Sequence, residues 1–406
     1  MSWRIKKILI THALIGFICW YSIEKVFQRS IGISVFEIAL MAVVYIATSA
    51  ILNIPTGLLA DKYGRKYAIF LATVALLACT IVAGTAHSFA QYTCAVFLWG
   101  VFFTTQNGAY EAILYDSLKE EGNVDKYTKY SGFSSAGFWL AIFVSSIIGA
   151  YVGSQFGLRY AYLITVIPNV LAVLLALTLQ EPKNHALKAT VSSVKMVRAG
   201  FKAVTSSSRM IYLSATYLVV ALAGWSANEF SQLFFIELGF SVLIIGILNG
   251  VSGLFQAMGN FFSYKMSNVS NRTVVITLFV LFSLTFALPP HLRILSTCLF
   301  LVLVFMQHSF TISNNARIQH LLPSEIRATS ISALGMMNDV VLVFSYLSFG
   351  YLSQRSSVRV GFLVFVVYGF VVLLIAKFFA DRSANVETPI DSADGPIIDE
   401  VESYPR

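Results

Sequence analysis

The sequence is poor in charge and in cysteine. Charged residues make up 12% of its 406 residues and hydrophobic residues 57%, whereas soluble domains carry about 25% charged residues. With a mean hydropathy of +0.74, this composition excludes an ordinary soluble protein and indicates an integral membrane protein. The few cysteines lie in or beside apolar stretches without paired spacing, so we predict small buried residues rather than disulfides or metal ligands. They are Cys19, Cys79, Cys94 and Cys298.

Motifs of the common enzyme classes are also missing. No G-x-x-x-x-G-K-[ST] loop occurs, so ATP is not expected as the energy source. H-E-x-x-H, paired Cys-x-x-Cys and G-x-S-x-G are absent too,. The sequence therefore gives little support to an enzyme, and we expect neither a cofactor nor a bound metal.

Long apolar stretches occupy most of the chain. Tyr67 to Tyr110 contains no Asp, Glu, Lys or Arg, and Gly84 to Ser88 splits this run in two. One span needs roughly 20 apolar residues. Charged residues and Gly/Pro/Asn clusters then predict twelve spans, at 8–27, 37–60, 67–86, 91–116, 129–152, 158–179, 210–236, 241–264, 273–288, 293–317, 329–352 and 358–380. The predicted fold class is an all-α membrane protein with two pseudo-symmetric six-helix bundles.

Basic residues predict how the chain is oriented in the membrane. With the N-terminus inside, 22 of the 28 Lys and Arg residues fall on the cytoplasmic side, as the positive-inside rule requires. We therefore expect a multi-pass protein of the cell (inner) membrane with both termini in the cytoplasm. The net charge of +8 then reflects topology, and we expect membrane lipids rather than nucleic acid as its surroundings.

A charged turn separates the second and third predicted spans. It reads Gly-Leu-Leu-Ala-Asp-Lys-Tyr-Gly-Arg-Lys from Gly57 to Lys66. This turn resembles the loop after the second helix of the major facilitator superfamily, G-x-x-x-D-[KR]-x-G-R-[KR], at every defined position. The stretch beginning at Pro323 is similar to the P-x-x-x-R-A-T-x-x-S start of that family's eleventh helix. The resemblance extends over about residues 5–380 and implies transport of a small molecule by a monomer.

The chain divides into two halves and a linker. Gly32-Ile33-Ser34 and Gly239-Phe240-Ser241 end corresponding hairpins 207 residues apart. We predict a six-helix bundle at 1–181, a cytoplasmic linker at 182–208, a second bundle at 209–381 and a disordered acidic tail at 382–406. Apolar residues of the linker recur at helical spacing, which favours an interfacial helix over a plain linker. They are Val191, Val194, Val197, Phe201 and Val204.

The resemblance assigns gating roles to the charged turn. It implies that Asp61 meets the N-terminus of the eleventh helix, after Arg327, where free N–H groups and the helix dipole favour an anion. It also implies that Arg65 pairs with Asp61 and with an acid at the inner end of the fourth helix, here Asp116. Together these contacts form a latch that closes the inner side. Gly57 and Gly64 permit close helix approach and a tight turn; topology alone is the simpler explanation of the basic residues.

A second inner contact is predicted from the fourth and tenth spans. Glu111 lies on a polar stripe with Asn107 and Thr104 if the fourth span is one helix. Arg317 lies at nearly the same depth in the tenth span. These positions allow a Glu111–Arg317 salt bridge when the inner side is closed, although two solvated cavity charges are the favoured interpretation.

Two titratable residues lie near the middle of the membrane. Asp339 is about ten residues into the eleventh span, and His308 is equally deep in the tenth. Because a charge in the hydrocarbon layer costs roughly 2.5–3.5 kcal/mol, such residues are candidates to carry a coupling proton. A hydrogen-bonded core histidine and a structural helix–helix bond are the respective alternatives for His308 and Asp339.

Two further acids lie toward the outer side at equivalent depths in the repeats. Glu24 has Trp20 one turn below it, and Glu229 has Trp225 one turn away. Acids framed by aromatic faces suit a lipophilic cation. The basic neighbours of Glu24, notably Lys25, offer the alternative that Glu24 is simply neutralised.

These features together predict a transporter. We expect a proton-coupled antiporter that exports small-molecule drugs or metabolites. A proton-coupled importer of a sugar or other polar metabolite, a lipid flippase and a non-transporting receptor remain open. Many relatives have an arginine in the fourth helix four residues before a glycine. Here Val96 takes that position before Gly100, so any proton role of the arginine in relatives cannot operate in this chain.

Overall fold

The computed structural model describes residues 2–182, 193–266, 268–323 and 326–386, without the side chains of 54, 61, 193–197, 328 and 383–386. The regular structure in these ranges is helical. The first half contains α1 (Trp3–Gly16), η1 (Tyr21–Ile23), α2 (Glu24–Ser30), α3 (Val35–Tyr63), α4 (Arg65–Gly84), α5 (Phe89–Gln106), α6 (Ala109–Glu120), η2 (Val124–Lys126), α7 (Tyr127–Gln155) and α8 (Leu158–Leu177). The second part contains α9 (Ser193–Val204), α10 (Ser208–Glu237), α11 (Val242–Phe262), η3 (Ser263–Met266), α12 (Asn271–Ala287), η4 (Pro290–Leu292), α13 (Arg293–Leu321), α14 (Arg327–Arg355) and α15 (Val358–Val386).

The predicted helical membrane fold is confirmed. Within the described ranges, ten segments are long and apolar enough to cross a membrane, and α12 is a shorter apolar helix of 17 residues. The remaining predicted span, 91–116, consists of two helices, α5 and α6. The prediction of one continuous helix there was wrong, because Gly108 adopts a left-handed conformation with φ +72° and starts a new helix.

The first span is interrupted as well. Helix α1 ends at Gly16, and the chain then passes through an irregular stretch and η1 before α2 begins at Glu24. Helix α7 supports this break: its Ser145 hydroxyl accepts a hydrogen bond from the Ile18 N–H at 3.2 Å. Thr165 of α8 accepts another from the Cys19 N–H at 3.0 Å. Side chains distant in sequence thus satisfy backbone groups that the broken helix leaves free.

Serine caps mark the repeated hairpins. Ser34 accepts a hydrogen bond from the Glu37 N–H at 3.2 Å, and the Glu37 carboxylate accepts one from the Ser34 N–H at 2.7 Å, which is a capping box,. Ser241 caps α11 in the second half. Each serine lies two residues after a glycine with positive φ, +86° at Gly32 and +73° at Gly239. Both turns predicted from the 207-residue offset therefore consist of a glycine with positive φ followed by a serine cap two residues later.

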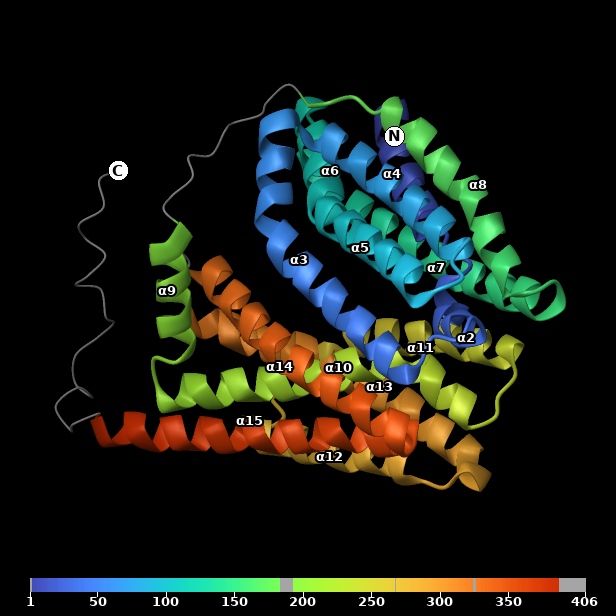
Figure 1. The fold of residues 1–406 in the computed structure, drawn as a ribbon. Coiled ribbons are helices and arrows are strands. Elements are labelled where there is room, and N and C mark those ends of the chain that lie inside the picture. Colours follow the sequence, from blue (N-terminus) through green and yellow to red (C-terminus); the bar gives the residue numbers. More distant parts are fainter. Residues whose placement is uncertain (1, 183–192, 267, 324–325, 387–406) are drawn as a thin grey trace.

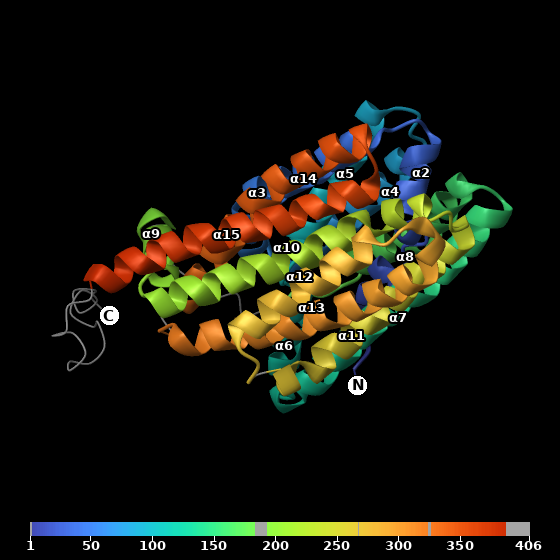
Figure 2. The ribbon, with the colours of Figure 1, turned by 90° about the horizontal axis from the view of Figure 1, so that it is seen from below.

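The two halves touch at one side of the bundle and diverge at the other (Figure 1). We call the diverging side, which carries α9 and the ends of α3 and α6, the linker side. At the opposite side α3 contacts α14 and α7 contacts α11, and the latter pair also lies side by side in Figure 2. Gly350 lies against Ala39, and Gly246 lies against Ala150. Small residues therefore bring the halves together at the side away from the linker.

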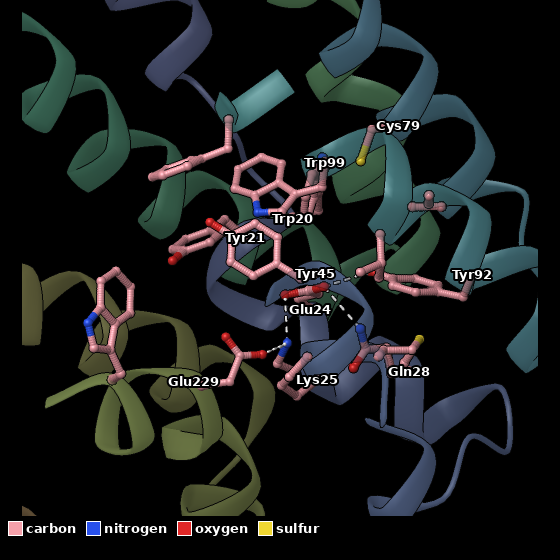
Figure 3. A pocket seen from close by; sticks show the side chains of 17 residues that line it. Trp20, Tyr21, Glu24, Lys25, Gln28, Tyr45, Cys79, Tyr92, Trp99 and Glu229 are labelled. Carbon is pink, nitrogen blue, oxygen red and sulfur yellow. Dashed lines mark hydrogen bonds and ion pairs between the residues drawn. The ribbon is translucent and has the colours of Figure 1, made fainter. Parts of the chain in front are cut away.

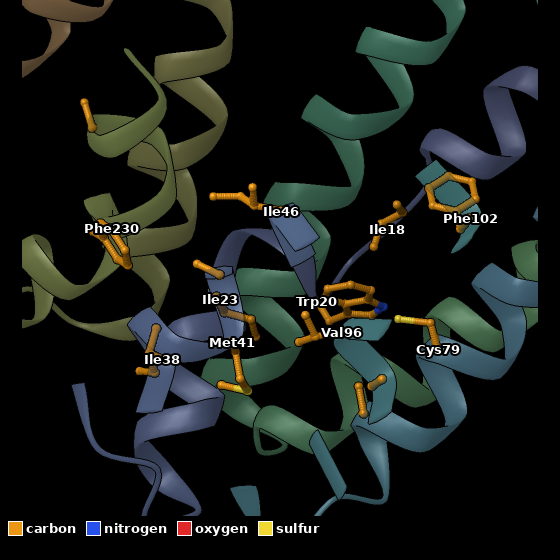
Figure 4. Packing of buried hydrophobic residues seen from close by; sticks show 14 of the residues in the cluster. Ile18, Trp20, Ile23, Ile38, Met41, Ile46, Cys79, Val96, Phe102 and Phe230 are labelled. Atoms are coloured by element: carbon orange, nitrogen blue, oxygen red, sulfur yellow. The ribbon is translucent and has the colours of Figure 1, made fainter. Parts of the chain in front are cut away.

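Apolar side chains of several helices form the core of the first half. Trp20, Met41, Cys79 and Val96 pack together from the first span, α3, α4 and α5 (Figure 4). In the second half, Phe286 stacks on Phe362 with ring centroids 3.7 Å apart. Both sets of residues belong to one continuous apolar cluster, so apolar packing also joins the two halves.

Only two of the cysteines match their predicted burial. Cys19 and Cys79 are buried, whereas Cys94 and Cys298 are exposed, and all four are free thiols. The apolar flanks of Cys79, Cys94 and Cys298 did indicate helices, but did not indicate which helix face points outward. An exposed, slightly apolar side chain is tolerated on such a face because lipid surrounds it.

The linker region contains helix α9, and its place at the membrane interface stays a prediction. Helix α9 packs against the start of α14, where Gly200 lies against the Thr329 backbone. Val204 is fully buried with Leu213, Ile318 and Leu334. Val191 lies outside the described residues, and the side chains of Val194 and Val197 are not described. Helix α15 continues to Val386, five residues into the stretch predicted as a disordered tail, and the rest of that tail, 387–406, lies outside the described residues.

Candidate functional site

A cavity of about 120 Å³ lies where the two halves meet (Figure 3). It is lined by side chains of the first span, α3, α4, α5 and α10. A single water needs only roughly 10–15 Å³ of such space, so the cavity can admit several waters or part of a small molecule. Four of the predicted site residues line it, namely Trp20, Glu24, Trp225 and Glu229.

Three charged side chains meet in this cavity. The Lys25 ammonium lies 3.1 Å from a Glu24 oxygen and 2.7 Å from a Glu229 oxygen. Lys25 and Glu24 belong to the first half and Glu229 to the second, so the shorter of the two ion pairs joins the halves (Figure 3). From the sequence, Lys25 was expected only to neutralise Glu24, and this bridge was not predicted.

Glu24 has neutral partners in addition to Lys25. Its second oxygen accepts hydrogen bonds from Gln28 Nε2 at 3.0 Å and from the Tyr92 hydroxyl at 3.3 Å. The Tyr92 hydroxyl is in turn 2.8 Å from that of Tyr162. Glu24 is therefore held firmly by its own half of the protein.

Gln232 provides a second connection across the halves. Its Oε1 accepts a hydrogen bond from the Lys25 N–H at 2.8 Å, and its Nε2 donates one to the Tyr21 carbonyl at 2.9 Å. These backbone groups are available because the first span is broken between Gly16 and Glu24. The break thus positions Glu24 and Lys25 and also exposes backbone to the second half.

Aromatic rings form much of the cavity wall. Trp20 stacks on Tyr162 with centroids 5.2 Å apart, and its Nε1 donates to the Thr80 hydroxyl at 3.2 Å. Trp99 lies edge-on to Trp20, with centroids 5.6 Å apart. Trp225, from the second half, is 52% exposed. The cavity therefore has a rigid aromatic wall in the first half and a freer ring in the second.

The predicted mid-membrane residues do not line this cavity. Asp339 is half-buried on α14, and within the described ranges it has no hydrogen bond or ion pair. Its carboxylate is within electrostatic range of three tyrosines, Tyr45, Tyr217 and Tyr346. His308 is half-buried on α13, and its Nε2 is buried without a hydrogen-bond partner among the described residues. The roles of both residues in proton coupling remain predictions.

The polar stripe predicted along the fourth span is not formed. Thr104 is buried on α5, while Asn107 lies at the break and Glu111 lies in the first turn of α6, both exposed. The helix break at Gly108 separates Thr104 from Glu111, so the helical spacing assumed in the sequence does not hold. Asn107 and Glu111 do not line the cavity around Glu24.

The ion pair expected in the charged turn is present. Arg65 pairs with Asp116, and its Nη1 also donates to the Ala112 carbonyl at 2.8 Å. Gly64 ends α3 with φ +101°, so the predicted tight turn is confirmed. Gly57 lies in α3 with open space around it among the described residues, and close helix approach is not seen at that position.

Glu181 supports this turn and was not predicted from the sequence. Its carboxylate accepts hydrogen bonds from the N–H groups of Arg65 at 2.8 Å and Lys66 at 2.6 Å. It thereby caps the N-terminus of α4, where free N–H groups and the helix dipole favour an anion. An acid placed directly after the sixth span was the available signal.

The predicted latch across the halves is not closed in this arrangement. The side chain of Asp61 is not described, but the end of α3 and the start of α14 lie far apart (Figure 1). Arg327 donates instead to the Leu322 carbonyl at 3.2 Å. Arg317 donates to Asn271 at 2.9 Å within its own half. Both latch predictions concern a conformation with the linker side closed, so they remain predictions.

Comparisons with known proteins agree with this architecture. The Major Facilitator Superfamily profile matches residues 8–268 and 230–399. A probable 4-methylmuconolactone transporter of Cupriavidus pinatubonensis (strain JMP 134 / LMG 1197) is 24% identical over 172 residues, and the match spans 40% of each chain.

Solved structures share the fold at low sequence identity. A mutant of the nucleoside transporter NupG has a TM-score of 0.75 at 16% identity, covering 92% of this chain and 99% of its own. A D-xylose-proton symporter has a TM-score of 0.67 at 13% identity, covering 92% and 96%. A bacterial homologue of the human lysosomal transporter Spinster, inward-facing and unoccupied, has a TM-score of 0.68 at 15% identity, covering 95% and 98%. With a family profile that matches most of its length, the chain belongs to the Major Facilitator Superfamily.

Proposed function

We propose that this protein is a proton-coupled secondary transporter that exports lipophilic organic cations by alternating access. The observation that carries the proposal is the cavity between the halves, which combines aromatic walls with two carboxylates and one ammonium. These lining charges sum to −1 when all three groups are ionised. Aromatic faces attract cations by about 0.5–2 kcal/mol, so wall and charge favour the same class of ligand.

The arrangement of the halves supports alternating access. The positive-inside rule assigns the linker side to the cytoplasm. The halves diverge on that side and touch on the other (Figure 1). Under this orientation the protein is open to the cytoplasm, from which an exporter takes up its cargo. Reorientation would then close the linker side through the turn that holds Asp61 and Arg65.

Proton coupling is supported by titratable residues within the membrane-spanning helices. Asp339 has no ion-pair partner in the described part of the chain. Because an unpaired charge at such depth costs roughly 2.5–3.5 kcal/mol on insertion scales, a bound proton relieves that cost. His308 is the second candidate, since its buried Nε2 lacks a hydrogen-bond partner among the described residues.

Uptake of an organic acid is a second candidate function. Lys25 offers the cavity an ammonium group, and the partially matching relative is described as a probable 4-methylmuconolactone transporter. An anionic cargo would compete with Glu24 and Glu229 for Lys25. Two carboxylates already hold this ammonium at 3.1 and 2.7 Å, which favours the cation proposal. Polar-metabolite import and lipid flipping remain alternatives without a specific contact to favour them.

Flux measurements in proteoliposomes test these proposals. The purified protein is reconstituted, a pH gradient is imposed, and uptake of an aromatic cation, an aromatic carboxylate, a sugar and a fluorescent phospholipid is compared. We expect cation flux driven by the gradient and lost in Asp339→Asn. Carboxylate flux alone would support the second candidate, and flux indifferent to the gradient would contradict proton coupling.

A further inference from the structure

We propose that Glu229 exchanges Lys25 for an incoming cation each time the protein opens on the side opposite the linker. This inference rests on the proposed function only in supplying the cation, which is either a proton or an organic ammonium group. The proposal concerns a conformational exchange, so it can be tested without measuring transport.

The first step follows from which half holds each charge. Lys25 bridges Glu24, its neighbour in the chain, and Glu229 of α10 (Figure 3). When the halves separate on this side, the Lys25–Glu229 contact of 2.7 Å must break. Lys25 keeps Glu24 as its partner, because both residues belong to α2. Glu229 leaves with the second half and loses its counterion.

The second step follows from what surrounds Glu229. Its electrostatic neighbours besides Lys25 and Glu24 are tyrosines of the first span, α3 and α14, namely Tyr21, Tyr45 and Tyr346. These groups offer no replacement positive charge, and Asp339, within range of two of them, adds a further acid. An ionised carboxylate that has lost its counterion in a partly desolvated site costs free energy. A proton or a ligand ammonium group removes that cost, and the aromatic ring of Trp225 lines the same cavity.

Glu24 does not share this behaviour. It has Lys25, Gln28 and Tyr92 as partners within the first half, and all three remain when the halves separate. The two acids that look equivalent in the sequence therefore differ: Glu24 stays paired throughout the cycle, and Glu229 alternates between two cations. The exchange links opening on this side to arrival of a positive charge.

Distance measurements between spin labels provide the test. Labels are attached at Ser154→Cys and Ser356→Cys, exposed positions at the ends of α7 and α14 on the contacting side, in full-length protein whose native cysteines are replaced. Distance distributions are recorded between pH 8 and pH 5 by pulsed electron resonance. For the parent we expect the long-distance, open population to rise by about tenfold or more at the acid end, because one linked proton changes an equilibrium by up to about tenfold per pH unit. In Glu229→Gln we expect this population to be raised at both ends and to lose its dependence on pH.

Glu237→Gln is the matched control. Glu237 lies on the same helix but pairs with Arg359 of its own half at 2.7 Å, so the pH response should stay as in the parent. The double variant Lys25→Glu with Glu229→Lys again places opposite charges across the two halves. At pH 8 it should therefore regain the closed population that Glu229→Gln loses. Retention of the parental pH response in Glu229→Gln would overturn the proposal, as would an equal loss of response in Glu237→Gln.

A titration with tetraphenylphosphonium at pH 8 separates the two kinds of cation. A shift toward the open population that requires Glu229 identifies an organic cation as an exchange partner, whereas a response to pH alone identifies the proton. Both results support the exchange, and a response to neither contradicts it. Failure of the flux experiment with an intact distance response would reject the proposed function while leaving the exchange at Glu229 in place.

Discussion

Adding one methyl group at Gly149 should disrupt the contact between α7 and the irregular stretch of the first span. Gly149 lies in α7, and a Cβ there would overlap the backbone carbonyl of Cys19. Neither partner can rotate away, because one is a helix backbone and the other is a carbonyl held in the irregular stretch. The neighbouring Cys19 N–H is itself fixed by a 3.0 Å hydrogen bond to Thr165. We therefore expect Gly149→Ala to push the first span away from α7.

The size of the effect follows from two opposing contributions. Overpacking costs typically about 1–3 kcal/mol, while alanine in a helix gains about 1 kcal/mol over glycine. Because the clash at Gly149 involves backbone on both sides, the cost should lie at or above the upper end of that range. The free energy of unfolding should therefore fall by about 2 kcal/mol, which corresponds to a decrease in Tm of about 4–8 °C for a bundle of 150–250 residues.

Gly137→Ala on the same helix is the control. A Cβ at Gly137 would lie 3.7 Å from the Ala13 side chain, an ordinary contact, so only the gain in helix propensity should remain. Thermal unfolding of both variants in detergent, followed by tryptophan fluorescence, measures the difference. Equal Tm values for Gly149→Ala and Gly137→Ala would refute the inferred contact between α7 and the break.

Three further predictions concern the charged residues of the linker side. Glu181→Ala should lower Tm, because two N–H groups at the start of α4 lose their acceptor and caps of this kind contribute about 1 kcal/mol; a Tm equal to that of the parent would argue against the cap. Asp61→Asn should leave membrane insertion intact but reduce flux in vesicles, since the motif predicts its role only when the linker side closes; unchanged flux would remove the latch. Exchanging the charges of Glu111 and Arg317 should restore flux lost in each single variant, and absence of rescue would leave them as separate cavity charges.

Features that depend on local sequence could be predicted. Apolar length indicated the spans, and the turn residues indicated the repeated hairpin ends that Ser34 and Ser241 cap. The partner of Arg65 was found through the family motif, because Asp116 occupies a fixed place relative to the fourth helix. In each of these cases the deciding interaction involves neighbouring residues or a recurrent motif.

Features that depend on distant partners could not be predicted. At the break, Ser145 and Thr165 accept hydrogen bonds from the Ile18 and Cys19 N–H groups, and nothing near Trp20 in the sequence indicates those acceptors. The bridge from Lys25 to Glu229 requires the two halves to be placed side by side. Sequence spacing identified both acids but treated them as equivalent.

The interruption of the first span explains why a site forms where it does. A continuous helix uses its own backbone groups, and it offers only side chains to its neighbours. The interruption before Glu24 exposes the Tyr21 carbonyl and the Lys25 N–H, which Gln232 of the other half then binds at 2.9 and 2.8 Å. Backbone groups of this kind are tolerated in a membrane only where protein or a polar cavity satisfies them. The break is therefore stable while the halves touch here, and separation must expose the same groups to water or cargo in the opened cavity.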